Sequence, residues 1–167
     1  MNTQGKKPRS RNNVLFLVIA LFLIFVDQLT KFLALKFLEP SVSVEIIDDV
    51  LRFILIFNDR AAFSLGGPVT WIFTVISTLA ALALLWFGPR WKTRGWRIIG
   101  AVALGGVVGN LIDRLIQPPG FPNGYVIDFI QLPFNLPIFN IADVAITTSA
   151  FLIAIRVIRG EPLGGKS

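Results

Sequence analysis

The 167-residue chain contains no cysteine and no histidine. Without cysteine it has no disulfide bonds, no thiolate nucleophile and no thiolate zinc ligands. Without histidine it also lacks the most common general base and metal ligand. Any chemistry must therefore rely on carboxylates, hydroxyls, amides, lysine or arginine, and we expect no metal site.

Charged residues are also scarce. They make up 16% of the chain, and hydrophobic residues make up 54%, whereas a soluble domain has about 25% charged and about 45–50% apolar residues. With a mean hydropathy of +0.70, the chain is expected to lie in lipid. Lysine and arginine outnumber acidic residues 16 to 10, but no basic stripe interleaved with aromatics indicates nucleic-acid binding.

Four apolar segments approach the length of about 20 residues that a helix needs to cross a bilayer. They cover residues 14–35, 69–87, 98–116 and 141–158. The sequence therefore predicts a mainly α membrane protein in which residues 1–167 form one integral membrane domain with four transmembrane helices.

Basic residues cluster on alternate sides of these segments, which predicts their orientation because lysine and arginine gather in cytoplasmic loops. They precede the first span, separate the second from the third and follow the fourth, whereas residues 117–140 contain none: Lys6, Lys7, Arg9, Arg11, Arg90, Lys92, Arg94, Arg97, Arg156, Arg159 and Lys166. Both termini, a basic tail at 1–13 and a tail at 159–167, are predicted to be cytoplasmic. Residues 36–68 and 117–140 are predicted to be extracytoplasmic.

The first span also has the basic start of a cleavable signal peptide, whose apolar core is about 7–15 residues long. Its apolar run is longer, no clear small-residue cleavage site follows, and Asp27 and Lys31 interrupt its far end. We therefore expect an uncleaved anchor.

The stretch "SVSVEIIDDVLRFILIFND", residues 41–59, is rich in β-branched residues with partial alternation. This pattern favours a short strand pair on the extracytoplasmic membrane surface, between the first and second helices. The strands either grip a substrate or form a surface sheet without substrate contact.

Most of the unusual polar residues are predicted at one level, the extracytoplasmic membrane surface. An ionisable group at membrane depth costs about 2.5–3.5 kcal/mol on insertion scales, which makes each one a functional candidate. The set comprises Asp27, Lys31, Asn58, Asp59, Arg60, Asn110, Asp113, Arg114, Asp128, Asn140 and Asp143.

Some of these polar residues also have structural explanations. Asp27 and Lys31 are four residues apart and could form an ion pair at the interface. Gly105 and Gly109 form a small-xxx-small pattern that favours close helix packing. Asn110, Asp113 and Arg114 share one helix face, which indicates an inward-facing site or polar network.

Asp143 could lie in the first turn of a helix capped by Asn140, where the helix dipole favours negative charge. Asp128 has no such explanation, because it stands in the apolar stretch "GYVIDFIQL" after a turn-rich loop. Two carboxylates at one depth can share a proton and act together as acid and base on an amide.

Five motifs occur in order along nearly the whole chain: "VDQLTKF" at 26–32, "FNDRAAFS" at 57–64, "GNLIDR" at 109–114, "VIDFI" at 126–130 and "FNIADVAI" at 139–146. Together they resemble the bacterial lipoprotein signal peptidases, also called signal peptidase II. The resemblance implies four spans with both ends inside, a small sheet called a cradle, and a mobile helical loop over the site.

The resemblance also implies a function. These proteins are intramembrane aspartyl endopeptidases that remove the signal peptide from bacterial prolipoproteins by cleaving before the diacylglyceryl-modified cysteine. They need no cofactor, act in the cytoplasmic membrane with the site at its extracytoplasmic face, and are blocked by globomycin. We expect the chain to be a monomer in contact with membrane lipid.

By the same resemblance, Asp128 and Asp143 are the catalytic dyad. Asn58, Asn110, Asp113, Arg114 and Asn140 match positions around it, and Asp27 and Lys31 match the first-span motif. We expect a structural role for Asp113 and a substrate-facing one for Arg114. Arg60 stands where the family commonly has glycine, two residues after Asn58.

Three other functions stay open at this point. A Ser/Lys peptidase could use Ser64 or another hydroxyl with Lys31. A proton or ion pathway is less consistent with inner span halves that look apolar and with the lack of an inverted repeat. A non-enzymatic scaffold would explain the glycines but not the paired aspartates.

Overall fold

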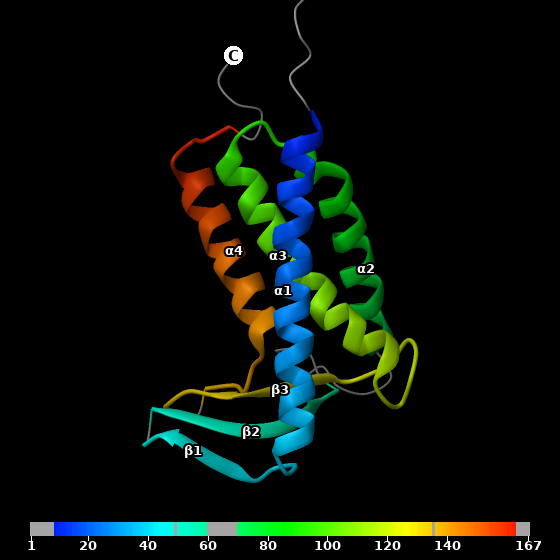
Figure 1. The fold of residues 1–167 in the computed structure, drawn as a ribbon, viewed down its shortest axis with the longest axis vertical. Helices are drawn as coiled ribbons and strands as arrows, with labels where there is room; N and C mark the ends of the chain where they lie inside the picture. The colour runs from blue at the N-terminus through cyan, green and yellow to red at the C-terminus, as the bar shows by residue number, and fades with distance from the viewer. Residues whose placement is uncertain (1–8, 49, 60–69, 135, 163–167) are drawn as a thin grey trace, which may run out of the picture.

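The computed structural model describes residues 9–48, 50–59, 70–134 and 136–162, with side chains from residue 13 onward. Four helices form a bundle, and a sheet lies across one end of it (Figure 1). Several residues used above lie outside this description: Lys6, Lys7, Arg60, Ser64 and Lys166, as well as the side chains of Arg9 and Arg11.

Four helices are long and apolar enough to cross a membrane: α1 (Arg9–Phe37), α2 (Thr70–Phe87), α3 (Arg94–Ile116) and α4 (Ile141–Ile158). This confirms the predicted fold class. The helix α1 starts earlier than the predicted span, and so does α3, because Thr93 caps α3 by accepting a hydrogen bond from the backbone N–H of Trp96. Apolar runs mark the lipid-facing length of a helix, whereas caps determine where it begins.

The helix α3 is the centre of the bundle and packs against the other three. Close approach depends on its glycines, as the small-xxx-small pattern predicted. A Cβ atom at Gly105 would lie 2.7 Å from the Cβ of Leu23 on α1, and one at Gly106 would lie 2.6 Å from the carbonyl oxygen of Ala142 on α4. These positions let the backbones of three helices come together at membrane depth.

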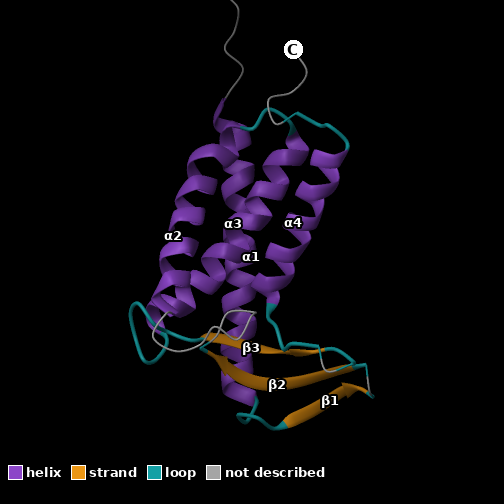
Figure 2. Cartoon of the chain, turned by 180° about the vertical axis from the view of Figure 1, so that it is seen from behind, coloured by secondary structure: helices purple, strands orange, loops and turns teal. Residues whose placement is uncertain are grey.

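The sheet has three antiparallel strands in the order β1 (Ser43–Ile47), β2 (Leu51–Asn58) and β3 (Val126–Gln131). The first two strands confirm the expected pair. The third was not predicted, because residues 117–140 were interpreted as a connection. The stretch "VIDF" is buried on both faces, so it shows no alternation, and it pairs with the edge of β2 that would otherwise be open (Figure 2).

A single β-bridge joins the sheet to the start of α4. Phe139 pairs with Ile130, and their backbone groups exchange hydrogen bonds of 3.0 and 2.9 Å. The next residue, Asn140, is the N-cap of α4. The bridge therefore fixes where α4 begins relative to β3.

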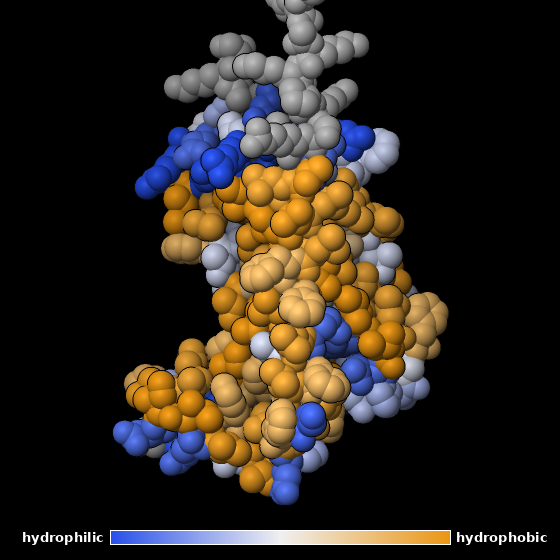
Figure 3. Space-filling view, in the orientation of Figure 1, coloured by the Kyte–Doolittle hydropathy of each residue, from blue (hydrophilic) through white to orange (hydrophobic). Residues whose placement is uncertain are grey.

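The surface divides into zones along the bundle axis. An apolar belt of exposed side chains from α1, α2 and α4 surrounds the bundle, and basic residues gather at the end opposite the sheet (Figure 3). Basic residues mark the cytoplasmic end in membrane proteins. The orientation of both termini towards the cytoplasm stays a prediction.

The packing of α3 against α4 generates the first test. We expect Gly106→Ala to lower the stability by about 1–3 kcal/mol, because its new methyl group meets rigid backbone and forces two helices apart. Thermal unfolding in detergent measures the effect.

Gly95→Ala on the same helix is the matched control, because a Cβ atom there meets the flexible guanidinium group of Arg156. Equal melting temperatures for the two variants would contradict the close α3–α4 contact.

Candidate active site

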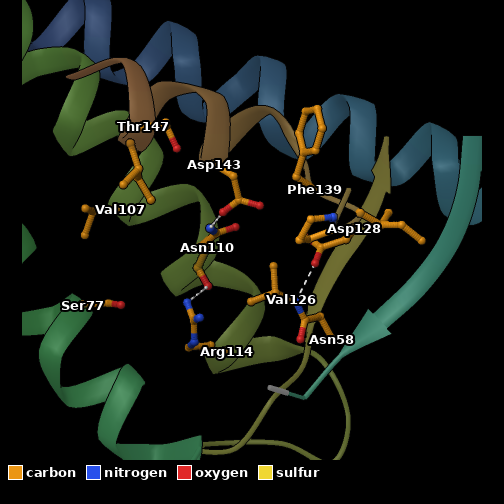
Figure 4. Close-up of a pocket in the computed structure, with 13 residues that line it drawn as sticks. Asn58, Ser77, Val107, Asn110, Arg114, Val126, Asp128, Phe139, Asp143 and Thr147 are labelled. Atoms are coloured by element: carbon orange, nitrogen blue, oxygen red, sulfur yellow. Dashed lines mark hydrogen bonds between the residues drawn. The ribbon is translucent and has the colours of Figure 1, made fainter. Parts of the chain in front are cut away.

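A cavity of about 420 Å³ lies where the bundle meets the sheet. Its lining includes Asp128 from β3 and Asp143 from α4, whose carboxylates face the same space (Figure 4). The remaining lining residues come from α2, α3, α4, β2, β3 and the β3–α4 connection: Asn58, Ser77, Val107, Asn110, Arg114, Val126, Pro137, Ile138, Phe139, Ile146 and Thr147. Two carboxylates from separate elements therefore border one cavity.

The strand pairing of β2 with β3 positions Asp128. Asp128 lies opposite Ile56, and Asn58 is paired with Val126 two residues away. The side-chain amide of Asn58 donates to Oδ2 of Asp128 over 2.7 Å. Asp128 itself is almost fully buried. The register of one strand pair thus brings together two of the predicted site residues.

The first turn of α4 positions Asp143. Asn140 and Asp143 form a capping box, in which Oδ1 of Asn140 accepts from the backbone N–H of Asp143 and Oδ2 of Asp143 accepts from that of Asn140. This confirms the capping interpretation of Asn140. The other oxygen of Asp143 accepts from the side-chain amide of Asn110 over 2.8 Å. Capping therefore holds the carboxylate at the cavity.

Asn140 also links the two carboxylates. Its side-chain Nδ2 donates to Oδ1 of Asp128 over 2.7 Å, and its Oδ1 holds the backbone of Asp143. The same Nδ2 lies 3.0 Å from Oδ1 of Asn110. Because Asn140 is completely buried, this amide fixes the positions of both aspartates.

Behind the cavity lies a buried charge cluster, formed by Asp27, Lys31 and Asp113. The ammonium group of Lys31 is 2.8 Å from a carboxylate oxygen of each aspartate, and all three residues are 1% exposed. The predicted Asp27–Lys31 pair therefore exists, but in the protein interior and with a second carboxylate. A buried pair of this kind requires well-placed donors for its remaining oxygens.

Backbone groups from two further elements supply these donors. Oδ1 of Asp27 accepts from the backbone N–H of Ala142 in the first turn of α4, at 2.9 Å. Oδ2 of Asp113 accepts from the backbone N–H of Ile127 in β3, at 3.1 Å. The cluster thus ties α1 and α3 to the two elements that carry the cavity aspartates.

Lys31 also determines the orientation of the Asn110 amide. Oδ1 of Asn110 accepts from both Lys31 and Asn140, each at 3.0 Å. Since the oxygen faces these two donors, the NH₂ group faces Asp143. The cluster therefore acts on the cavity through one side-chain amide.

Asn110, Asp113 and Arg114 do not share one environment, although they share a helix face. Asn110 and Arg114 line the cavity, whereas Asp113 belongs to the buried charge cluster. The guanidinium group of Arg114 donates to the backbone carbonyl of Asn110 over 3.2 Å. This placement is consistent with a structural Asp113 and a substrate-facing Arg114, and both roles stay predictions.

Burial is the main cause that raises the pKa of Asp128 from its ordinary value of 3.8 to about 7. The negative charge of Asp143 raises it further, while the amides of Asn58 and Asn140 and the charge of Lys31 lower it. Asp128 is therefore set to carry a proton near neutral pH.

Sequence reasoning missed Gln28. Its side-chain NH₂ group donates to Asp27, to Asp113 and to the backbone carbonyl of Gly109 over 3.1–3.2 Å. The signal was available, because an amide inside an apolar span needs partners. Ser77 and Thr147, which also line the cavity, carried no comparable signal.

No group of three or more acidic residues that could hold a metal ion occurs in the described part of the chain. Each cavity aspartate is contacted by two nitrogen donors instead. Asp128 and Asp143, held by these donors, can each bind and release a proton at the cavity.

The fold and the cavity define a multi-pass membrane protein with paired carboxylates at one end of its bundle. The family model described as signal peptidase (SPase) II matches residues 19–159. The chain therefore belongs to the signal peptidase II family and is a protease.

Individual relatives agree with this assignment. The lipoprotein signal peptidase of Leifsonia xyli subsp. xyli (strain CTCB07) is 39% identical over 153 residues, covering 92% of this chain and 71% of the relative. That of Mycobacterium leprae (strain Br4923) is 38% identical over 146 residues, covering 87% and 72%.

A solved structure described as a bacterial membrane enzyme, obtained by the in meso method at 2.3 Å resolution, has a TM-score of 0.76 at 28% identity. The match covers 92% of this chain and 93% of that one. A second, at 1.9 Å resolution, has a TM-score of 0.73 at 28% identity, with 86% and 92% covered.

The buried charge cluster predicts a large effect at Lys31. We expect Lys31→Met to lower the stability by about 3–5 kcal/mol, because it leaves two carboxylates buried without their cation. The melting temperature in detergent measures this loss. Lys36→Met on the exposed end of the same helix is the control, and an equal, small effect in both variants would contradict the role of the cluster.

The raised pKa of Asp128 predicts a pH-dependent stability. The folded state binds this proton more tightly than the unfolded state, so the stabilisation is complete below about pH 4 and is lost as the pH rises to about 7. Asp128→Asn has no such titration.

We therefore expect the melting temperature of Asp128→Asn, relative to the unmodified protein, to increase between about pH 5 and about pH 8. A difference that stays constant over this range would show that the pKa of Asp128 is not raised.

Proposed function

We propose that the chain is an aspartyl endopeptidase that removes signal peptides from bacterial prolipoproteins, with Asp128 and Asp143 as its catalytic dyad. The observation that carries this proposal is that the two carboxylates border one cavity and are joined by the side chain of Asn140. The relatives at 38–39% identity are named lipoprotein signal peptidases, which supports the same reaction here.

The two aspartates differ in environment, which supports different protonation states. Asp143 lies in the first turn of α4, where the helix dipole favours the carboxylate form. Asp128 lies in a strand, and its pKa of about 7 favours the protonated form. Asp143 is therefore the general base and Asp128 the general acid in the first step.

In that step Asp143 takes a proton from water as the water oxygen attacks the scissile carbonyl carbon, and Asp128 gives its proton to the carbonyl oxygen. When the tetrahedral intermediate collapses, the C–N bond breaks, Asp143 returns its proton to the leaving nitrogen and Asp128 takes one back from a hydroxyl group. The dyad ends in its starting state. Arg114 is available in the cavity to bind a substrate carbonyl.

The substrate is a prolipoprotein with a diacylglyceryl-modified cysteine, cleaved just before that residue. Its signal helix enters from the bilayer, since the cavity lies at the junction of the apolar belt and the sheet. We propose further that the basic end of the bundle faces the cytoplasm, which puts the site at the extracytoplasmic face of the cytoplasmic membrane. Inhibition by globomycin and a monomeric state belong to the same proposal.

The Ser/Lys alternative is less compatible with the geometry. Lys31 is held between Asp27 and Asp113 and does not line the cavity, so it is not available as a general base. An ion pathway is disfavoured by the position of the buried acidic residues, which gather near the sheet in the part of the chain that the structure describes.

The dyad predicts that Asp128→Asn and Asp143→Asn each lower the rate of cleavage by about 10²–10⁴-fold, the contribution of one positioned acid or base. A gel-shift assay with purified enzyme and a diacylglyceryl prolipoprotein, with and without globomycin, measures the rate.

Asp48→Asn, a substitution in the exposed turn between β1 and β2, is the matched control and is expected to retain full activity. Ser64→Ala is also expected to retain it. Cleavage at the normal rate by both dyad variants would refute the dyad, and loss of cleavage in Ser64→Ala would favour the serine mechanism.

A further inference from the structure

A second cavity, of about 400 Å³, adjoins the first at the start of α4. The two cavities share Pro137, Phe139, Asp143 and Thr147. The second is completed by Leu136, Val144 and Thr148, and Figure 3 shows the surface hollowed between α4 and the sheet. We call this second cavity the α4 groove. Asp143 thus separates the first cavity from a mostly apolar groove.

The α4 groove opens towards lipid. Leu136 in the β3–α4 connection and Val144 on α4 are 47% and 45% exposed. An apolar chain bound in this groove would keep one end in the bilayer and bring its other end to Asp143.

Two hydroxyl groups in the α4 groove, those of Thr147 and Thr148, have no hydrogen-bond partner within the described part of the chain. A threonine or serine in a membrane helix usually donates to a carbonyl one turn earlier, as Thr78 does to Thr74 and Ser149 does to Ala145, at 2.7 and 2.8 Å. Among the described residues, neither Thr147 nor Thr148 makes a hydrogen bond through its hydroxyl group. Two free donors facing lipid indicate a ligand that has acceptor atoms beside an apolar chain.

The reaction under "Proposed function" supplies such a ligand. The modified cysteine follows the scissile bond directly, so its thioether-linked diacylglyceryl group is only a few covalent bonds away from the scissile bond. When the scissile bond lies at Asp143, the diacylglyceryl group must therefore lie nearby. That group has two ester carbonyls, which accept hydrogen bonds, and two acyl chains. Its chemistry matches two hydroxyl donors at the edge of an apolar groove.

We propose that the α4 groove binds the diacylglyceryl group of the substrate, with Thr147 and Thr148 donating to its ester carbonyls and one acyl chain lying against Leu136, Phe139 and Val144. The inference rests on the proposed function and adds the direction in which the substrate lies across the two cavities. The signal peptide then occupies the first cavity on the side of Ser77 and Val107, and the lipid leaves on the α4 side.

The test compares two synthetic prolipoprotein peptides that differ only in their lipid linkage, a dipalmitoyl ester and a dihexadecyl ether. The ether lacks the carbonyl acceptors but keeps the chains. The variant is Thr147→Val with Thr148→Val, which keeps the side-chain shape and removes both hydroxyl groups.

We expect the double variant to raise KM for the ester peptide about three- to ten-fold, the effect of losing one or two hydrogen bonds. For the ether peptide we expect no difference between the variant and the unmodified enzyme. Thr78→Val, whose hydroxyl group is bonded within α2, is the control and is expected to match the unmodified enzyme with both peptides.

A second variant tests the apolar wall. Val144→Phe narrows the α4 groove, so we expect it to raise KM for the dipalmitoyl peptide and to leave KM for a diacetyl peptide unchanged. Equal effects on long and short chains would overturn the proposal.

An unchanged KM for the ester peptide in the double variant, or an equal rise in KM for the ester and the ether peptides, would also overturn the proposal. If native mass spectrometry then showed that this variant had lost a bound phospholipid, the groove would belong to a bilayer lipid instead. Asp143→Asn separates this inference from the proposed function, because continued cleavage by that variant refutes the dyad, whereas the linkage experiment addresses the α4 groove alone.

Discussion

Lys31 lies between the carboxylates of Asp27 and Asp113, with no solvent around it, and most of the site depends on this contact. Each aspartate uses its contacts to hold a different element: Asp27 binds the backbone at the start of α4, and Asp113 binds the backbone of β3. Charges at membrane depth are costly unless paired and hydrogen-bonded. The contacts that offset this cost come from α1, α3, α4 and β3. The charge cluster can therefore be buried only when these four elements are correctly assembled.

Side-chain amides connect this charge cluster to the two aspartates of the cavity. Lys31 orients Asn110, Asn110 contacts Asp143, and Asn140 contacts both Asn110 and Asp128. An asparagine side chain has a donor end and an acceptor end, so each contact fixes the direction of the next. The network holds two carboxylates close to one cavity while leaving their protonation free to change, which is what acid/base catalysis by a dyad requires.

The close contact of helices and the open groove have different roles in the reaction that we propose. Glycines on α3 let α1 and α4 approach until backbone and side-chain atoms are in contact, so the helices pack closely next to the two cavity aspartates. Beside it, α4 presents Val144, Thr147 and Thr148 to lipid. A substrate that is part peptide and part lipid has to meet both a fixed polar cavity and an apolar surface that continues into the bilayer.

The sequence by itself determined the helices and the candidate residues. Apolar length predicted four spans, partial alternation predicted β1 and β2, and Asp128 was distinguished because no cap explained it. These are local properties of neighbouring residues. It did not predict β3, because a strand buried on both faces shows no alternation, nor the ion pair between Asp113 and Lys31. Only the tertiary structure decided which partner each polar side chain takes, since Lys31 and Asp113, or Asn140 and Asp128, meet through packing between elements distant in the chain.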